Sequence, residues 1–386
     1  MIQQCLDSYH TSFTDFGAMF DYHKLQSENS RWERTQIKSL RVEPLDKTSS
    51  LYGDLSLFAP GVSTDAVTDT ADNLGLAIKL EDHYYPLRDI AFKSLADRAK
   101  ISGSALPKLK KKDLASVLNA CLKLHSASAL LLIRDEKIAA THSGDEKDYS
   151  ILEIPKLLES IGEKLLDRFP DKGEEPGFVF DSGYTDHSLT SASWSLPNYR
   201  EELLGAYKKV LAAQGKSVMA AKIMPGIRFS TSDTGMASAK ISALLLGLTY
   251  PIHIGGMLAV DHRGQSKIED FTENLNMLFV QFENAIAMLE KLTEIYLDYP
   301  VNAMTAICKK LSMPKKAAME AIAMFEYSIG SAAVTAHDIF MAMQEIIFIL
   351  KIEGTPENKL LIIEENLARA LTFRWTDYDY AKKVSY

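Results

Sequence analysis

Between Gly177 and Asp261 the chain consists mainly of short β-like runs that are separated by polar turns. Residues 177–194 alternate apolar and polar side chains around a turn-rich DSGYTD segment, which predicts a β-hairpin. Three further strands are predicted at about 219–228, 237–249 and 252–261. Their connections, STSDTG and the Tyr250-Pro251 step, are short. Because tight turns join antiparallel neighbours, these runs predict an antiparallel sheet.

Helical patterns surround these strands. Apolar residues recur at helical spacing in segments near 87–99, 114–124, 152–169 and 199–214. A further hairpin is predicted in SALLLIRDEKIAATHS, with Asp135-Glu136-Lys137 as its turn. The fold class expected from this order is α+β, with an antiparallel sheet and flanking helices rather than a doubly wound parallel sheet.

The chain becomes almost wholly helical after His262. Apolar residues recur every three or four positions from Ile268 to Tyr296, which predicts one long heptad-patterned helix within 266–297. We expect this helix to lie in a C-terminal helical bundle, and homo-oligomerisation through it is the open alternative. The predicted organisation is a polar N-terminal arm at 1–70, an α+β domain at 71–265 and a helical domain at 266–386.

The formal net charge of -8 argues against a generic nucleic-acid coat, which is usually strongly basic. Residues 266–386 hold 12 basic and 17 acidic side chains, so the rest of the chain is nearly balanced and leaves room for a local basic site. Cys5, Cys121 and Cys308 form no CxxC pair, which favours a reducing compartment. Without a secretory signal or an apolar run of about 20 residues, the sequence predicts a soluble cytoplasmic protein with no membrane partner.

One segment between predicted strands, GIRFSTSDTG at 226–235, combines Arg228 with Ser230, Ser232 and Asp233. A guanidinium, hydroxyls and backbone amides could bind a phosphate or another anion. The alternative is a hairpin turn in which the Ser, Thr and Asp side chains satisfy the backbone.

The next polar cluster contains His253, Asp261, His262 and Arg263. Such residues could form a metal site or an acid–base pair, or simply the polar end of a strand. Arg263 is kept as a candidate anion contact. No nucleotide-binding loop, HExxH or GxSxG motif occurs, so we predict no catalytic residue, no metal and no cofactor.

The most basic stretch contains Lys108, Lys110, Lys111 and Lys112 and lies between two predicted helices. A second basic corner, with Lys309, Lys310, Lys315 and Lys316, surrounds Pro314. Both outlines resemble a helix-turn-helix, in which lysines would neutralise phosphates. The alternative is two ordinary helix corners with solvated lysines.

Three segments together resemble the phage/plasmid-like family named domain of unknown function 932. They are YYPLRDIAFKSLADRAKISGSALPKL, LLLIRDEKIAATHSGDEKDYSIL and GIRFSTSDTGMASAKISALLLGL. In the last one, Gly226-Ile227 and Ser232-Asp233-Thr234-Gly235 stand where the family has its G-I-x-x-x-N-S-E-x-G motif, with Thr231 and Asp233 in place of Asn and Glu. The similarity covers about residues 80–350. It implies an origin in a bacterial mobile element and a place in the bacterial host cytoplasm, with no catalytic residues to transfer.

These observations leave three functions open. The first is a non-enzymatic phage or plasmid protein that acts through self-assembly and partner binding, with nucleic acid as a candidate partner. The second is a host-defence antagonist or another factor that binds a host protein. The third is an enzyme that acts on a phosphorylated ligand, with Arg228, Asp233 and His253 near one site.

Overall fold

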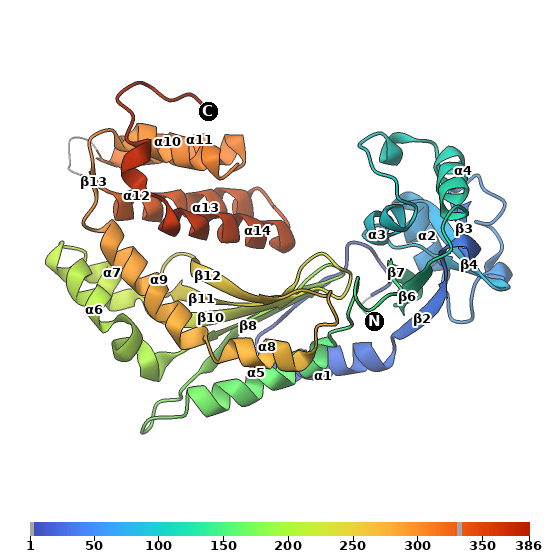
Figure 1. The fold of residues 1–386 in the computed structure, drawn as a ribbon, viewed down its shortest axis with the longest axis horizontal. Coiled ribbons are helices and arrows are strands. Elements are labelled where there is room, and N and C mark those ends of the chain that lie inside the picture. Colours follow the sequence, from blue (N-terminus) through green and yellow to red (C-terminus); the bar gives the residue numbers. More distant parts are fainter. Residues whose placement is uncertain (1–3, 330–333) are drawn as a thin grey trace.

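Two lobes of unequal size make up the computed structural model, which describes residues 4–329 and 334–386 (Figure 1). The smaller lobe is formed by residues 31–143, and most other described residues belong to the larger lobe. Each lobe has its own hydrophobic core. Among the described residues, the buried apolar side chains of 37–138 cluster separately from those of the larger lobe.

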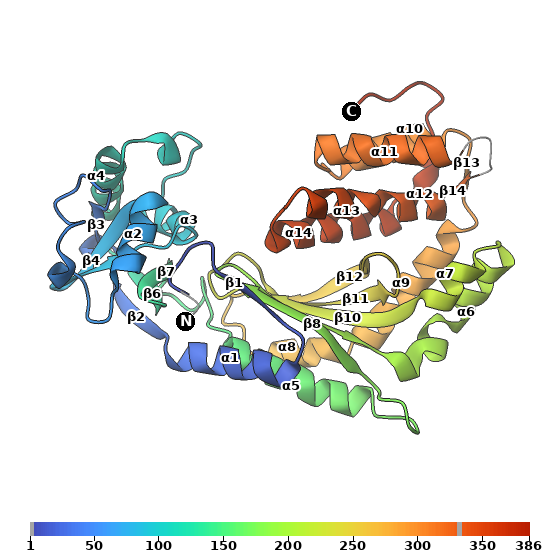
Figure 2. The same cartoon turned by 180° about the vertical axis from the view of Figure 1, so that it is seen from behind.

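A six-stranded antiparallel sheet forms the centre of the larger lobe. Its order is β1 (His10–Phe13), β8 (Val179–Asp186), β9 (Thr190–Ser195), β10 (Met224–Thr231), β11 (Ala239–Leu246) and β12 (Ile252–Val260). Figure 2 shows β1 at the edge of this sheet beside β8. Gly247 ends β11 at φ +82, and a β-carbon there would lie 2.0 Å from the Lys222 carbonyl oxygen, so this turn requires glycine.

Alternate residues of β10 face two different layers of helices. Ile227 and Phe229 belong to the main core, and Phe229 contacts Phe271 of α8 (Ile268–Leu275). This face is covered by α8 together with α1 (Phe16–Glu28), α5 (Ile154–Arg168) and α9 (Leu278–Leu292) (Figure 1). Arg228 lies between the two apolar residues and forms an ion pair with Glu364 on the opposite side.

The opposite face of the sheet is covered by a C-terminal layer of helices (Figure 1). The helices nearer the sheet are α12 (Ala336–Met343), α13 (Glu345–Ile352) and α14 (Glu357–Ala368), and α10 (Pro300–Lys310) and α11 (Lys315–Ile329) pack on their outer side. A two-stranded ladder of β13 (Tyr296–Leu297) and β14 (Val334–Thr335) precedes α12. The remaining helices, α6 (Arg200–Ala213) and α7 (Ser217–Lys222), lie between β9 and β10 in the sequence.

The smaller lobe contains two three-stranded sheets and three helices. The first sheet has β2 (Arg31–Gln36), β6 (Ser128–Arg134) and β7 (Lys137–Ser143), and the second has β3 (Arg41–Pro44), β4 (Leu76–Leu80) and β5 (His83–Pro86). The helices are α2 (Thr64–Asp72), α3 (Ala91–Arg98) and α4 (Lys111–Leu122). An isolated parallel bridge between Leu87 and Ile138 connects the two sheets.

The predicted fold class is confirmed, because an antiparallel sheet is flanked by helices and followed by several C-terminal helices. Both predicted hairpins form, as β6–β7 and β8–β9. In the second one the predicted turn is misplaced, because the DSGYTD segment is part of β8 and the chain reverses at 187–189. Asp135 and Glu136 have φ values of 49 and 70, as a tight hairpin turn requires. No helix in the described part of the chain is long and apolar enough to cross a bilayer.

The predicted N-terminal arm at 1–70 is not a separate element in its described part. β1 pairs with β8, β2 pairs with β6 and β3 pairs with β4, so this segment supplies a strand to each of three sheets. Its polar composition reflects strands with exposed faces, such as the RWERTQ sequence of β2. Residues 1–3 of the predicted arm lie outside the described residues.

The predicted long helix within 266–297 is interrupted at Asn276 and Met277, where α8 ends and α9 begins after a turn. Its apolar stripe, including Phe271, Phe282 and Leu289, is buried in the core of the larger lobe. This stripe is therefore not available for the predicted oligomer contact. The core also continues across residue 265, so the predicted boundary there does not separate two cores.

Candidate functional site at the junction of the lobes

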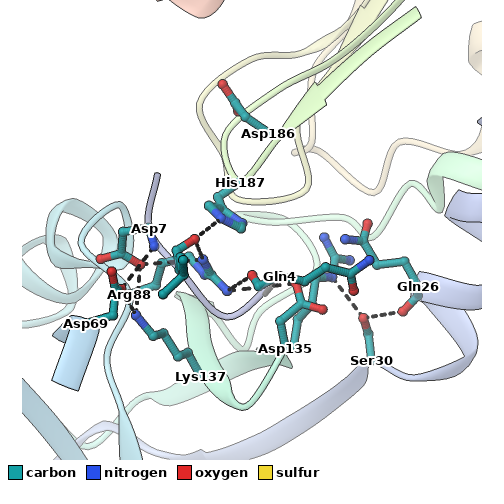
Figure 3. A network of polar contacts seen from close by, with 12 residues as sticks. Gln4, Asp7, Gln26, Ser30, Asp69, Arg88, Asp135, Lys137, Asp186 and His187 are labelled. Atoms are coloured by element: carbon teal, nitrogen blue, oxygen red, sulfur yellow. Dashed lines mark hydrogen bonds and ion pairs between the residues drawn. The ribbon is translucent and has the colours of Figure 1, made fainter. Parts of the chain in front are cut away.

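A network of buried charged side chains lies where the two lobes meet (Figure 3). Its members come from the segment before β1, from α2, from the start of α3, from the β6–β7 turn and from the large sheet. We refer to the residues Asp7, Asp69, Arg88, Arg134, Asp135, Lys137, His187 and Asp233 as the junction network.

Lys137 occupies the centre of one half of the junction network. Its side chain has no exposed surface, and its Nζ lies 3.1 Å from Asp7 Oδ1 and 2.5 Å from Asp69 Oδ2. The two acidic residues are also linked directly, because the backbone N–H of Asp7 donates to Asp69 Oδ2 at 3.0 Å. A buried ammonium requires such partners, since burial of an unpaired charge is strongly unfavourable.

Arg88 holds the chain segment before β1 against the smaller lobe. Its guanidinium is 1% exposed, donates to the carbonyl oxygens of Gln4 and Leu6, and lies 3.4 Å from Asp7 Oδ1 (Figure 3). His187, from the β8–β9 turn of the large sheet, contacts the same Leu6 carbonyl oxygen. Burial lowers the pKa of His187 to about 2, so its imidazole is neutral at pH 7.

Arg134 connects the lobes through Asp233, which lies between β10 and β11. Arg134 Nη2 is 2.6 Å from Asp233 Oδ2, and its Nε donates to Ser30 Oγ at 2.8 Å. Burial raises the pKa of the Asp233 carboxyl, but the Arg134 charge and hydrogen bond outweigh this effect, so the net pKa is lowered. The pair is therefore ionised at neutral pH.

Asp135, next to Arg134, is the least well compensated member of the junction network. Burial raises the pKa of its carboxyl despite Arg88 and Arg134, and its Oδ2 lies 3.8 Å from Arg88 Nη2. That distance is too long for a hydrogen bond.

A stack of aromatic rings continues the junction beyond Asp233. The His142 and Tyr149 rings lie 3.5 Å apart at 4°, and His262 stacks on the other side of Tyr149 at 5.6 Å. The Tyr149 hydroxyl and a His142 ring nitrogen both contact the Asp233 carbonyl oxygen, at 2.7 and 3.0 Å. Burial lowers the pKa of His142 to about 4, so this stack holds a neutral imidazole.

Two pockets open on the junction. One, of about 590 Å³, lies between the segment before β1, the β8–β9 turn and the start of α14, and it includes Arg88 and His187. The other, of about 340 Å³, lies between α1, β2 and the start of α5, and it includes Arg134 and Asp233. No group of three or more His, Cys, Asp or Glu side chains in the described ranges could hold a metal ion.

The predicted lysine patch lies away from this junction, in the smaller lobe. Lys108, Lys110 and Lys112 are exposed around the start of α4. Lys111 is half-buried, and its Nζ lies 3.3 Å from the Asn73 carbonyl oxygen. Two helices, α3 and α4, form here as predicted, and a 3-10 turn at Leu106–Lys108, which was not predicted, lies between them.

The predicted anion-binding residues of β10 do not form a surface site. Ser230 and Ser232 are buried, and Ser232 Oγ contacts Thr234 Oγ1 at 3.0 Å. The Arg228 guanidinium has a carboxylate partner in Glu364. The polar side chains of this segment have partners inside the protein, and Ser232 Oγ also accepts from the backbone N–H of Met236, as in the hairpin alternative rather than an open anion site.

The remaining predicted residues are also dispersed. Arg263 is exposed in the loop after β12, and His253 is buried on the face of the large sheet that includes Arg228. Asp233 belongs to the junction instead. The three residues of the enzyme hypothesis, Arg228, Asp233 and His253, therefore do not converge on one pocket.

Sequence reasoning missed the junction network. Lys137 is predicted to lie in the charged turn of a hairpin, but it begins a seven-residue strand in which every residue is buried. The sequence feature that could have indicated a buried charge is the position of Lys137 directly before the apolar run Ile138-Ala139-Ala140. Nothing local in the sequence marks its partners Asp7 and Asp69, which are 130 and 68 residues away.

Comparison with known proteins adds no relative. No protein-family model, no curated protein and no solved structure matches the chain. The class that the fold and site define is a two-lobed α+β protein with a buried ionic junction.

Proposed function

We propose that this chain is a non-enzymatic protein of phage or plasmid origin, a distant member of the domain of unknown function 932 family, that binds nucleic acid between its two lobes. The family resemblance supports the origin. The arrangement of lysines supports the ligand.

The observation that carries the proposal is the position of the two basic corners. Lys108, Lys110 and Lys112 lie near the α3–α4 connection, and Lys310 and Lys315 lie near the α10–α11 connection, all exposed. In Figure 1 these two connections lie on the sides of the two lobes that face each other, and we call the space between them the opening. A molecule placed there would meet lysines on both sides.

Lysines in such positions suit a phosphate backbone. Each phosphate neutralised by a lysine releases counterions, and this release supplies sequence-independent affinity. The net charge of -8 limits this attraction to the corners, so binding depends steeply on salt. With about four phosphate contacts, we expect affinity for duplex DNA to fall about a hundredfold between 50 and 200 mM salt.

The ion pairing of the buried cations and the low pKa values of the buried histidines favour a binding function over a catalytic one. The cations of the junction network already have carboxylate partners, and burial lowers the pKa of His142, His187 and His253. A general acid or base works best with a pKa near the operating pH.

The test is a gel-shift and anisotropy titration with single- and double-stranded DNA at 50 and 200 mM salt. Lys110→Glu/Lys112→Glu and Lys310→Glu/Lys315→Glu should each weaken binding at least tenfold and reduce the salt slope. Lys209→Glu, an exposed lysine of α6 away from the opening, is the matched control and should have little effect. Absence of binding at 50 mM salt, or equal effects of all three variants, would refute the proposal.

A further inference from the structure

The pocket of about 340 Å³ at the junction has a buried histidine nitrogen in its wall. His23 of α1 lines this pocket and is 1% exposed, yet its Nδ1 makes no hydrogen bond of normal geometry, although the Gln26 side chain lies nearby. Buried polar atoms in proteins are almost always hydrogen-bonded, so an orphan nitrogen at a pocket indicates a missing ligand atom.

A chain of hydrogen bonds lies behind His23. Its Nε2 contacts Thr190 Oγ1 at 3.5 Å, and Thr190 Oγ1 contacts Thr185 Oγ1 at 3.0 Å. Burial lowers the pKa of His23 to about 3, so the imidazole is neutral at pH 7 and one of its two nitrogens carries a lone pair. In the tautomer with the proton on Nε2 this lone pair is on Nδ1, where an N–H or O–H group of a ligand would be its partner.

The other walls of the pocket suit a flat ring. Trp32 of β2 is half-buried at the pocket, supported by Leu132 and Ala140. Gln26 of α1 and the apolar residues Ile151 and Pro155 complete the lining. An aromatic face, an amide and a directed acceptor are the elements that proteins use to hold a nucleobase. The volume is within the range of small-ligand sites.

We propose that this pocket binds a purine base, with its ring against Trp32 and an N–H group donating to His23 Nδ1. The site is separate from the two lysine corners, and the inference does not depend on the proposed nucleic-acid function. The base belongs either to a free nucleoside or to an unpaired nucleotide of a strand.

The experiment is calorimetric titration of the full chain with two pairs of nucleosides. Adenosine is compared with purine riboside, which lacks the 6-amino group, and guanosine with inosine, which lacks the 2-amino group. A hydrogen bond from the exocyclic amino group to His23 Nδ1 should make the amino-bearing nucleoside of at least one pair bind up to tenfold more tightly. In His23→Phe this preference should disappear, whereas in His83→Phe, an exposed histidine of β5, it should be retained.

A second variant addresses the stacking wall. Trp32→Leu should weaken binding of every purine at least fivefold, and circular dichroism melts establish that each variant is folded. The other two tryptophans, Trp194 and Trp375, are buried, so ligand quenching of fluorescence locates the base at Trp32. A short oligodeoxyadenylate is titrated as well. If it binds while adenosine does not, and if His23→Phe weakens this binding, the natural ligand is an unpaired base of a nucleic-acid strand. Absence of binding by nucleosides and oligomer, or binding that neither variant changes, overturns the proposal.

Discussion

Replacing Lys137 with methionine is the most direct test of the ionic junction. Methionine keeps most of the length of the side chain and removes only the ammonium. Asp7 then retains Arg88, whose Nη1 is 3.4 Å away. Asp69 loses its only ion-pair partner in the described part of the chain and keeps two hydrogen bonds, from the backbone N–H of Asp7 and from Asn73 Nδ2 at 3.1 Å.

The size of the effect follows from burial. Lys137 is fully buried, and Asp69 is 12% exposed, so water cannot replace the lost partner. Removing one member of a buried ion pair destabilises a protein by about 3–5 kcal/mol. That is a large part of the roughly 5–15 kcal/mol that typically separates folded and unfolded states. Adding Asp69→Asn removes the uncompensated charge and should restore about 1–3 kcal/mol.

Urea denaturation followed by circular dichroism measures these differences. Lys156→Met is the matched control, because Lys156 pairs with Glu153 at 2.7 Å but is 57% exposed, and an exposed pair contributes less than about 1 kcal/mol. If Lys137→Met is no more destabilising than Lys156→Met, or if Asp69→Asn worsens it, the assignment of Lys137 as the centre of the junction is wrong.

Two further predictions concern pH and the second buried ion pair. Because the pKa of His142 is about 4 when folded and about 6.5 when unfolded, its contribution to stability is full above pH 6.5. This contribution to the free energy of unfolding is lost as pH falls from 6.5 to 4, at about 1.4 kcal/mol per pH unit. Urea titrations at several pH values should show that His142→Phe removes this part of the pH dependence. Glu364→Leu should destabilise by about 3–5 kcal/mol by leaving Arg228 unpaired, whereas Arg228→Leu/Glu364→Leu should regain most of this loss. Equal denaturation midpoints for the single and double variants would contradict the second prediction.

The parts of the fold that were predictable are those with local signals. The β6–β7 hairpin has two apolar runs around a charged turn, and short segments connect β8 to β9, β10 to β11 and β11 to β12, whereas α6 and α7 lie between β9 and β10. The spacing of apolar residues and the residue types at turns are visible within a few residues, so a single sequence is enough to recognise such elements.

The parts that escaped prediction depend on contacts between distant residues. β1 pairs with β8 about 170 residues later, and HTSF carries no strong strand pattern. The stripe at 268–292 correctly marked buried residues, but its partner was the sheet of the same chain rather than another subunit. Periodicity shows which face of a helix is covered and does not show what covers it.

The nature of the junction relates the buried network to the proposed binding function. The lobes have separate apolar cores, and polar contacts such as Arg134–Asp233 and Lys137–Asp7 connect them. If the protein binds nucleic acid as we propose, these contacts hold the two lysine corners in place relative to each other. Binding to both corners at once then depends on Lys137, although Lys137 lies in the interior and does not touch the nucleic acid. Lys137→Met should weaken binding of a duplex that spans the opening while leaving the weaker binding by a single corner unchanged, and this difference separates a two-sided clamp from two independent basic patches.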